Sequence, residues 1–365
     1  MQAVRPAPKK PSLRDRVLEG LATGRPQVGP IQVHVDVTNR CNAACITCWD
    51  HSPLLKVART GAWKSRRLPW ETWQRLLQDL DAFESVGAVV LSGMGEPLTH
   101  PRIYDMMADV KARGWHLTVL SNLLAADLAR LCDAGIDNLL VGVHGATPEA
   151  YAAFHPGWDE SDFFRMTRGL KALANAGVRT RHVQVINRDT APDVPAMVRF
   201  GKRFEADRVN YKLASLAGGT EDCAITPEQR RWLVDEAVPE ARTLSEQLGV
   251  RTNLDLFEQQ LAAAGGDVTH VTAMDAVGCA MGFAYTRIAV DGTVLYCCNT
   301  EIEVGRVGEG SLAEQWYGPR WQDMRERIGR SEWFPGCARC GKFEQNVKWG
   351  ERQRTRGRVP FGASR

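Results

Sequence analysis

The chain has 365 residues, 44% of them hydrophobic, and a formal net charge of +3. This length is typical of about two domains, and the apolar fraction suffices for large cores. Ten cysteines without a recognisable secretory leader or long apolar run disfavour a disulfide-bonded secreted protein or a membrane partner, and favour a cytoplasmic protein. Basic residues are in excess only at Arg5–Lys10 and Arg352–Arg358, without interleaved aromatic residues, so we expect solvated ends and no nucleic-acid partner.

Three cysteines follow the first expected strand. Residues 31–37 alternate apolar and polar side chains, which predicts a strand, and Cys41, Cys45 and Cys48 lie on the loop after it. Three thiolates suit a four-iron cluster and leave one iron open, as a site that binds and cleaves a ligand requires. The trio alone leaves zinc binding and reduced core thiols open as alternatives.

A glycine-rich turn follows the second expected strand, residues 87–92. The turn is Gly93-Met-Gly95-Glu96-Pro97, in which the glycines permit close backbone approach. Glu96 offers an acceptor for an ammonium group. Alone, such a turn is usually only a turn, but next to a three-cysteine loop it indicates a binding site.

The middle of the chain alternates strands and helices. The pattern over residues 69–77 predicts an amphipathic helix, and glycines stand where helices need left-handed caps. Strict alternation predicts a parallel sheet with helices outside, and six strands are too few for a closed eight-stranded barrel. The four further strands are expected at 115–120, 138–143, 181–186 and 208–214, the first three after Gly114, Gly135 and Gly177.

The C-terminal third contains a second group of cysteines. Asp291-Gly292 between two apolar runs is a strong signal for a two-residue hairpin. The hairpin brings Cys279, which precedes it, close to Cys297, which follows its turn. A Cys-X-X-Cys pair further along the chain can complete a four-thiolate site. The four expected ligands are Cys279, Cys297, Cys337 and Cys340.

Two questions remain open for this second group. Four thiolates also make a zinc ribbon, although the single Cys279 and the long gap to Cys337 fit its usual spacing poorly. In an extended strand neighbouring side chains point to opposite faces, so only one of Cys297 and Cys298 is expected to ligate. The spacing from the turn glycine favours Cys297.

The cysteine trio followed by the Gly-Glu-Pro turn resembles the radical S-adenosylmethionine (SAM) superfamily. There the open iron is chelated by the amino and carboxylate groups of SAM, and the glycine-rich turn binds the amino group. The resemblance implies an α/β fold, a partial (βα)6 TIM-like barrel, with Gly93, Gly95, Glu96 and Pro97 at the cofactor. One departure is Thr47, where the family usually has an aromatic residue, with Trp49 after the last cysteine instead.

The same resemblance assigns residues at the strand ends. Asn122, His144 and Asn187 close the third, fourth and fifth strands, and by analogy they line the bound SAM. A strand-end histidine that is merely hydrogen-bonded is the alternative for His144. Gly142 stands where many members carry a serine.

The second cysteine group resembles the twitch domain, a shortened relative of the SPASM domain found behind radical SAM barrels. It implies a small α+β domain with a β-hairpin and one auxiliary [4Fe-4S] cluster, because no cysteine follows Cys340. A linker with a capping box at Thr226 and a break near Pro239 is expected to return across the barrel mouth, so that the auxiliary cluster caps the opening that holds SAM. The expected organisation is a basic N-terminal segment at 1–30, the barrel at 31–225, the helical linker at 226–275, the twitch domain at 276–345 and a basic tail at 346–365.

The implied activity is reductive cleavage of SAM followed by hydrogen abstraction from an unactivated C–H bond of a small-molecule or peptide natural-product precursor. The auxiliary cluster implies net two-electron oxidation, and an external one-electron reductant such as flavodoxin or ferredoxin is expected. A redox-neutral epimerase is one alternative, with Cys223 on the loop after the sixth strand as the hydrogen donor, although a packing role fits that thiol as well. A non-enzymatic zinc-binding protein is the other.

Overall fold

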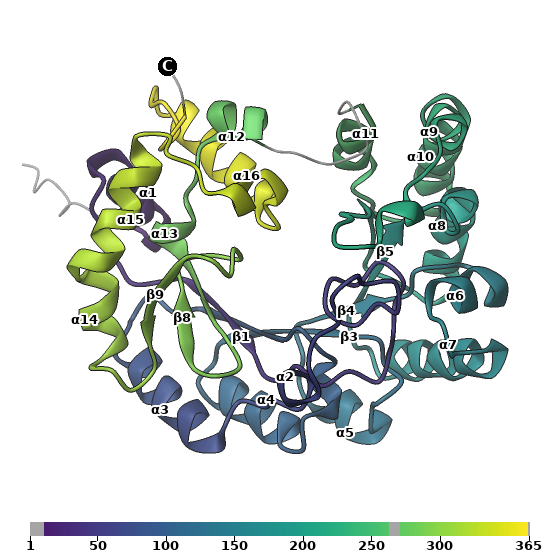
Figure 1. Ribbon diagram of the computed structural model, residues 1–365, viewed down its shortest axis with the longest axis horizontal. Coiled ribbons are helices and arrows are strands. Elements are labelled where there is room, and N and C mark those ends of the chain that lie inside the picture. The colour runs from purple at the N-terminus through teal and green to yellow at the C-terminus, as the bar shows by residue number, and fades with distance from the viewer. Residues whose placement is uncertain (1–10, 263–270, 364–365) are drawn as a thin grey trace, which may run out of the picture.

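A single curved sheet organises the protein. The computed structural model describes residues 11–262 and 271–363. Nine strands follow the order β6-β5-β4-β3-β2-β1-β7-β8-β9. Helices cover the convex side of the sheet, and we call the opposite, concave side the inner face (Figure 1). Within the described ranges, no helix is long and apolar enough to cross a membrane.

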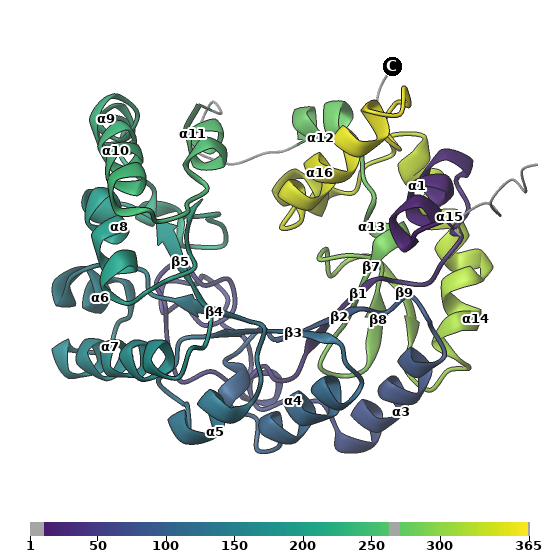
Figure 2. The same ribbon diagram turned by 180° about the vertical axis from the view of Figure 1, so that it is seen from behind.

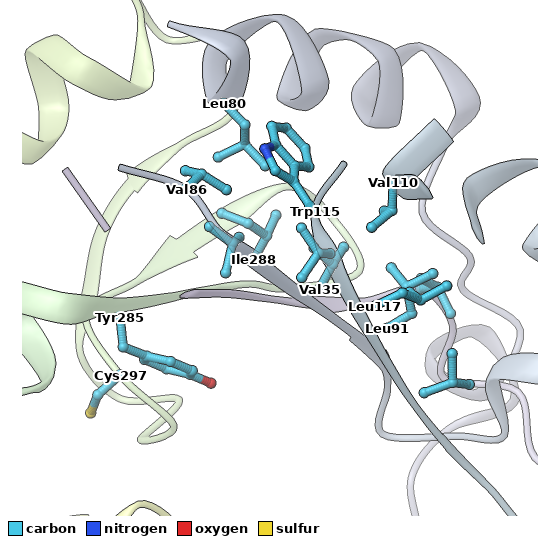
Figure 3. Close-up of a cluster of buried hydrophobic side chains, with 14 of the residues drawn as sticks. Val35, Leu80, Val86, Leu91, Val110, Trp115, Leu117, Tyr285, Ile288 and Cys297 are labelled. Carbon is cyan, nitrogen blue, oxygen red and sulfur yellow. The ribbon is translucent and has the colours of Figure 1, made fainter. Parts of the chain in front are cut away.

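The six predicted barrel strands all form, and each pairs in parallel with the next. Val33 and Val35 of β1 (Gln32–Asp36) have no exposed surface, because alternate side chains of the strand face the outer helices. Figure 3 shows Val35 in this apolar layer with Leu117 and Ile288. The other barrel strands are β2 (Ala88–Ser92), β3 (His116–Ser121), β4 (Asn138–Gly142), β5 (Thr180–Ile186) and β6 (Arg208–Leu213).

Helices of the barrel lie on the convex side, as the alternation predicts. The amphipathic pattern is confirmed by α3 (Trp70–Asp81), which buries Trp73 and Leu76. The predicted cap glycines at 114, 135 and 177 have left-handed φ angles of 70°, 65° and 71°. The remaining helices of this region are α2 (Gly61–Lys64), α4 (Ile103–Ala112), α5 (Leu128–Asp133), α6 (Pro148–Phe154), α7 (Glu160–Asn175) and α8 (Val194–Arg203), with 3₁₀ turns η1 (Pro97–Thr99) and η2 (Ala191–Asp193).

The predicted C-terminal hairpin extends the barrel sheet. β7 (Tyr285–Ile288) runs parallel to β1, and β8 (Thr293–Leu295) is antiparallel to both β7 and β9 (Glu303–Arg306). The loop has three residues, 290–292, rather than the predicted two, because Ala289 donates to the Thr293 carbonyl and Gly292 donates to the Ala289 carbonyl. Gly292 takes the left-handed position of this loop, with a φ of 84°. Because β8 returns toward the start of β7, the residues after it lie level with the amino-terminal half of β1. That the auxiliary cluster caps the opening that holds SAM stays a prediction.

The predicted linker is helical and begins with the expected capping box at Thr226 and Gln229. The break near Pro239 is a π-helical turn, η4 (Leu233–Ala237), because proline lacks the N–H that closes a regular turn. The expected return across the mouth falls on residues 263–270, which lie outside the described residues. The flanking helices α11 and α12 stand on opposite sides of the concave face in both views (Figures 1 and 2). The helices are α9 (Pro227–Trp232), α10 (Val238–Leu248), α11 (Leu254–Ala262) and α12 (Val271–Val277).

The two ends of the described chain pack together. Arg358 donates to the carbonyl of Leu18 in α1 (Leu13–Thr23) at 3.2 Å, and Phe361 meets Phe283 edge-on with ring centroids 4.8 Å apart. The expectation of a solvated C-terminal tail is therefore wrong, because Phe361 buries apolar surface against the body. Arg5–Lys10 lies outside the described residues. The remaining helices are α13 (Met281–Ala284), α14 (Leu312–Tyr317), α15 (Pro319–Gly329) and α16 (Phe343–Arg354), with 3₁₀ turns η3 (Glu221–Cys223) and η5 (Pro335–Arg339).

Candidate active site and metal centres

The loop after β1 holds its three thiols close together and away from water. Burial is the main cause that raises the pKa of each thiol, to about 11 for Cys41. For Cys41 and Cys45, the negative charge of neighbouring thiolates raises the pKa further. The Cys48 sulfur accepts the backbone N–H groups of Asp50 at 3.5 Å and His51 at 3.3 Å. Hydrogen bonds to sulfur and positive metal charge both stabilise thiolates, so the loop suits a cluster that supplies that charge.

The glycine-rich turn interlocks with the cysteine loop. A Cβ atom at Gly93 would lie 2.3 Å from the carbonyl oxygen of Thr38, and one at Gly95 would lie 2.2 Å from that of Arg40. The Glu96 N–H donates to the same Arg40 carbonyl at 2.8 Å. The close approach expected of these glycines is therefore made to the cysteine loop, and the two motifs form one unit.

Replacing Gly95 by alanine is expected to lower stability by about 1–3 kcal/mol, because the new methyl group has no room against backbone. Gly87→Ala is the matched control, since a Cβ there meets nothing within 4 Å. Thermal unfolding of both variants measures the difference. Equal melting temperatures would contradict the interlocked arrangement.

Glu96 is a buried carboxylate with neutral partners. It accepts the N–H of Leu98 at 3.0 Å, the hydroxyl of Ser121 at 2.8 Å and the N–H of Asn122 at 2.8 Å. Burial outweighs these hydrogen bonds and raises its pKa to about 7. An amino group bound here would supply the positive charge that favours the ionised form. Pro97 begins the 3₁₀ turn η1, so the carboxylate and the start of that turn are fixed together.

His144 occupies the space that a larger residue at position 142 would need. Its Nε2 lies 2.6 Å from an ideal Cβ at Gly142, and its ring stacks on Phe154 with centroids 4.4 Å apart. Its Nδ1 accepts the Val185 N–H at 3.2 Å, and burial keeps its pKa well below the usual value. The neutral ring must therefore carry its proton on Nε2, which becomes a donor beside the end of β4.

The strand-end residues Asn122 and Asn187 differ in whether their side-chain amides have hydrogen-bonding atoms left for a ligand. Asn122 donates through Nδ2 to Asn42 at 2.8 Å and accepts the Leu124 N–H through Oδ1 at 2.9 Å. Asn187 is fully buried, and its Oδ1 accepts the Thr190 N–H while its Nδ2 has no hydrogen-bond partner. The unpartnered amide is the atom that a ligand or water would have to satisfy.

His155 is a polar residue of this region that the sequence does not single out. It lies at the end of α6, where its Nδ1 donates to the Tyr151 carbonyl at 2.8 Å. Its Nε2 is then an acceptor, buried and without a partner. Nothing in the sequence marks it, because it follows an ordinary helical stretch rather than a strand end.

Five thiols line one cavity beside β8. The predicted cysteines contribute to it together with Cys298, from the segment after β8, from η5 and from the start of α13. Burial raises the pKa of Cys279 to about 12. The chain bends at Tyr296–Cys298 instead of continuing as a strand, so both neighbouring sulfurs reach the cavity. Which of the two sulfurs ligates a cluster stays a prediction, with Cys297 as the expected ligand. The lining cysteines are Cys279, Cys297, Cys298, Cys337 and Cys340.

The described thiols are not arranged around a single ion. Among residues 11–262 and 271–363, no three Cys, His, Asp or Glu side chains converge closely enough to hold one metal ion. A tetrahedral zinc site at a Zn–S distance of about 2.3 Å brings its sulfurs to about 3.8 Å from one another, whereas a multi-iron cluster is a larger body.

Cys223 packs beneath the cysteine loop. Its sulfur lies 4.0 Å from the carbonyl oxygen of Ile46, and only 3% of the residue is exposed. Ile46 and Phe154 share this small apolar cluster. On the same side, the Trp49 indole donates to the Ser215 carbonyl at 2.5 Å, which ties the cysteine loop to the chain after β6. These contacts give Cys223 a packing role, and its hydrogen-donor role stays a prediction.

Comparison with known proteins identifies both regions. The sequence pattern of the Radical SAM superfamily matches residues 35–200, and that of the SPASM domain, an iron–sulfur cluster-binding domain, matches residues 279–341. The PqqA peptide cyclase of Xanthomonas axonopodis pv. citri is 24% identical over 342 residues, covering 88% of this chain and 82% of that protein. The tungsten-containing aldehyde ferredoxin oxidoreductase cofactor-modifying protein of Pyrococcus furiosus is 27% identical over 110 residues, 29% of this chain and 28% of that protein.

A solved structure agrees with the fold. SuiB of Streptococcus suis, crystallised with SAM, aligns with a TM-score of 0.59 at 15% identity, covering 88% of this chain and 72% of SuiB. SuiB bound to the precursor peptide SuiA aligns with a TM-score of 0.57, 15% identity, and coverage of 85% of this chain and 70% of SuiB. The iron–sulfur character of the second region removes the zinc-binding alternative. The chain therefore contains a radical SAM domain over residues 35–200 and a C-terminal SPASM iron–sulfur domain over residues 279–341, and these domains imply SAM with a [4Fe-4S] cluster in the barrel and an auxiliary iron–sulfur cluster in the second domain.

Proposed function

We propose that this enzyme removes a hydrogen atom from an unactivated C–H bond of a peptide precursor and completes a net two-electron oxidation. With SAM and its clusters bound, the protein would have a radical source for the first step and an electron acceptor for the second. Peptide substrates are favoured because PqqA peptide cyclase and SuiB, which bind or modify peptides according to their names, span most of this chain. An external reductant such as flavodoxin or ferredoxin remains part of the proposal.

The placement of the two cysteine groups carries this proposal. Cys41 follows the carboxyl end of β1, whereas Cys297 follows β8, whose last residue Leu295 pairs with Arg287 and so lies level with His34 of β1. The five residues of β1 span about 13 Å at 3.3 Å per residue. A substrate on the inner face alongside β1 would therefore have one cysteine group on either side. We assign SAM contacts to Gly93, Gly95, Glu96, Asn122, His144 and Asn187 within this arrangement.

Mass spectrometry of candidate precursor peptides after anaerobic turnover tests the proposal. Oxidation gives a product lighter by two hydrogens, formed together with 5′-deoxyadenosine. A product of unchanged mass in ordinary water that becomes one mass unit heavier at the inverted carbon in deuterated water would favour the epimerase instead. SAM cleavage without any peptide product from the whole candidate set would contradict a peptide substrate.

Glu96→Gln is expected to weaken SAM binding by about ten- to a hundred-fold at pH 8, because hydrogen bonds to a charged acceptor are the stronger kind. In the wild type the Glu96 pKa of about 7 means that the carboxylate becomes available as the pH rises, so affinity should increase between pH 6 and 8. The glutamine variant should lose this pH dependence. Anaerobic equilibrium dialysis measures both effects.

Glu71→Gln is the matched control, since Glu71 is exposed on the first turn of α3. It should bind SAM as the wild type does at every pH. If Glu96→Gln keeps wild-type affinity at pH 8, the carboxylate does not hold the SAM amino group.

A further inference from the structure

Arg325 of α15 is a buried cation without a carboxylate partner. Its exposed fraction is 0%, and its Nε and Nη1 atoms donate to the carbonyls of Gly282 at 2.8 Å and Trp316 at 2.9 Å. Its Nη2 atom has no hydrogen-bond partner, and no carboxylate among the described residues forms an ion pair with it. Burial lowers its pKa to about 10, so the guanidinium is still charged at neutral pH. A buried charge without a partner is costly, so we expect a negative charge nearby.

Aromatic rings surround this guanidinium. Its central carbon lies 4.9 Å from the ring centroid of Trp316, 5.2 Å from that of Trp321 and 5.5 Å from that of Phe283. The faces of such rings attract a cation and stabilise it, but they leave its net charge unchanged. In surroundings of low polarity the field of that charge reaches beyond the rings.

The side chain of Arg325 lies directly behind the cavity that the second cysteine group lines. Ile328, one turn further along α15, lines this cavity. Met281 lines it too, and Arg325 donates to the carbonyl of the next residue, Gly282. Tyr296 lines the cavity and touches Gly282 with its hydroxyl group, which occupies the place of a Cβ there. The helices that carry these residues, α13 and α15, pack side by side (Figures 1 and 2). The charge is therefore separated from the cavity by a single layer of side chains.

The auxiliary cluster implied for this cavity would supply the missing negative charge. Four thiolates outweigh the positive charge of a [4Fe-4S] core, so a fully ligated cluster is an anion. On reduction it takes up one electron and gains one more negative charge, while no bond needs to form or break. A fixed cation nearby stabilises the reduced state more than the oxidised state, and this raises the reduction potential.

We propose that the buried charge of Arg325 raises the reduction potential of the auxiliary cluster and so makes that cluster the better electron acceptor. Two unit charges about 10 Å apart in a protein interior interact strongly enough to change an equilibrium constant about ten-fold. The inference rests on the proposed peptide oxidation and names the residue that adjusts its electron acceptor. In that oxidation the substrate radical gives one electron to the cluster and one proton to solvent as it becomes the product.

Redox titration of the anaerobic holoenzyme, followed by electron paramagnetic resonance, measures the potential of each cluster. SAM binds the barrel cluster, so the signal that SAM perturbs belongs to the barrel and the other signal to the auxiliary cluster. Arg325→Met removes the charge and keeps a long apolar side chain. It should lower the equilibrium constant for reduction of the auxiliary cluster at least about ten-fold, a fall of about 59 mV for one electron. Arg325→Lys keeps the charge and should keep the wild-type potential.

Arg320→Met is the matched control, because Arg320 is exposed on the first turn of the same helix. It removes one positive charge from the surface of α15 and should leave both potentials unchanged. The barrel cluster is a second control within each sample, since its potential should be the same in all variants. Iron content is measured in every variant, so that a lost cluster is not mistaken for a shifted potential.

A wild-type auxiliary potential in Arg325→Met would overturn the proposal. An equal fall in Arg325→Lys would overturn it too, because the effect would then follow the shape of the side chain and not its charge. If Arg325→Met loses its auxiliary iron, Arg325→Lys decides: an intact cluster at the wild-type potential supports the proposal, and loss of iron there as well overturns it in favour of a structural role. An auxiliary potential that depends on this charge in an enzyme that yields no oxidised peptide would instead contradict the proposed function and leave the electrostatic role standing.

Discussion

Replacing Cys41, Cys45 and Cys48 together by alanine is expected to abolish 5′-deoxyadenosine production completely. These thiols share one loop, and with three ligands only they leave an iron open for SAM. The loop is fixed against the turn that carries Glu96 through the Arg40 carbonyl. The triple variant should fold and keep about four irons per chain, because the second cysteine group is untouched.

Chromatographic detection of 5′-deoxyadenosine and iron analysis of the same sample measure both parts of this prediction. Cys132→Ala is the control, since that half-buried thiol on α5 belongs to neither cysteine group. Residual SAM cleavage in the triple variant would refute the assignment of the trio. Loss of all iron would show that the two groups do not bind clusters independently.

Cys297→Ala is expected to remove the auxiliary cluster, about four irons per chain, whereas Cys298→Ala is expected to retain it. Both sulfurs reach the same cavity, so distance alone does not choose between them. Cys297 is 9% exposed and its sulfur accepts the Asn299 N–H at 3.3 Å, an arrangement that stabilises a ligating thiolate. The spacing from Gly292 favours the same residue.

Iron and sulfide contents of the two single variants decide between the sulfurs. Because the first cysteine group stays intact in both, each variant should still cleave SAM, which shows that it is folded. The reverse pattern, with iron lost only from Cys298→Ala, would show that Cys298 and not Cys297 is the ligand. Iron retained in both would mean that either sulfur can complete the site.

The parallel barrel could be predicted from local patterns. Apolar alternation and the cap glycines at 114, 135 and 177 fix each strand and helix independently of the rest of the chain. The cysteine spacings and the Gly-Glu-Pro turn are equally local, and both motifs are brought together by the pairing of β1 with β2. These features needed no knowledge of distant contacts.

Other features depend on contacts between distant segments. The bend at Tyr296, which turns both Cys297 and Cys298 into one cavity, follows from packing and not from the hairpin signal. The Asp36–Arg287 ion pair joins residues 251 positions apart, and no spacing rule connects them. The sequence of the C-terminal segment predicts a solvated basic tail, and the packing of Phe361 against Phe283 is visible only in the structure.

We expect two iron–sulfur clusters to flank the inner face of the barrel. Iron and acid-labile sulfide analysis of the anaerobically prepared wild-type enzyme tests it most directly. We expect about eight irons and eight sulfides per chain, falling to about four of each when Cys41, Cys45 and Cys48 are replaced. Four irons in a fully reconstituted wild type, or zinc without sulfide, would contradict it.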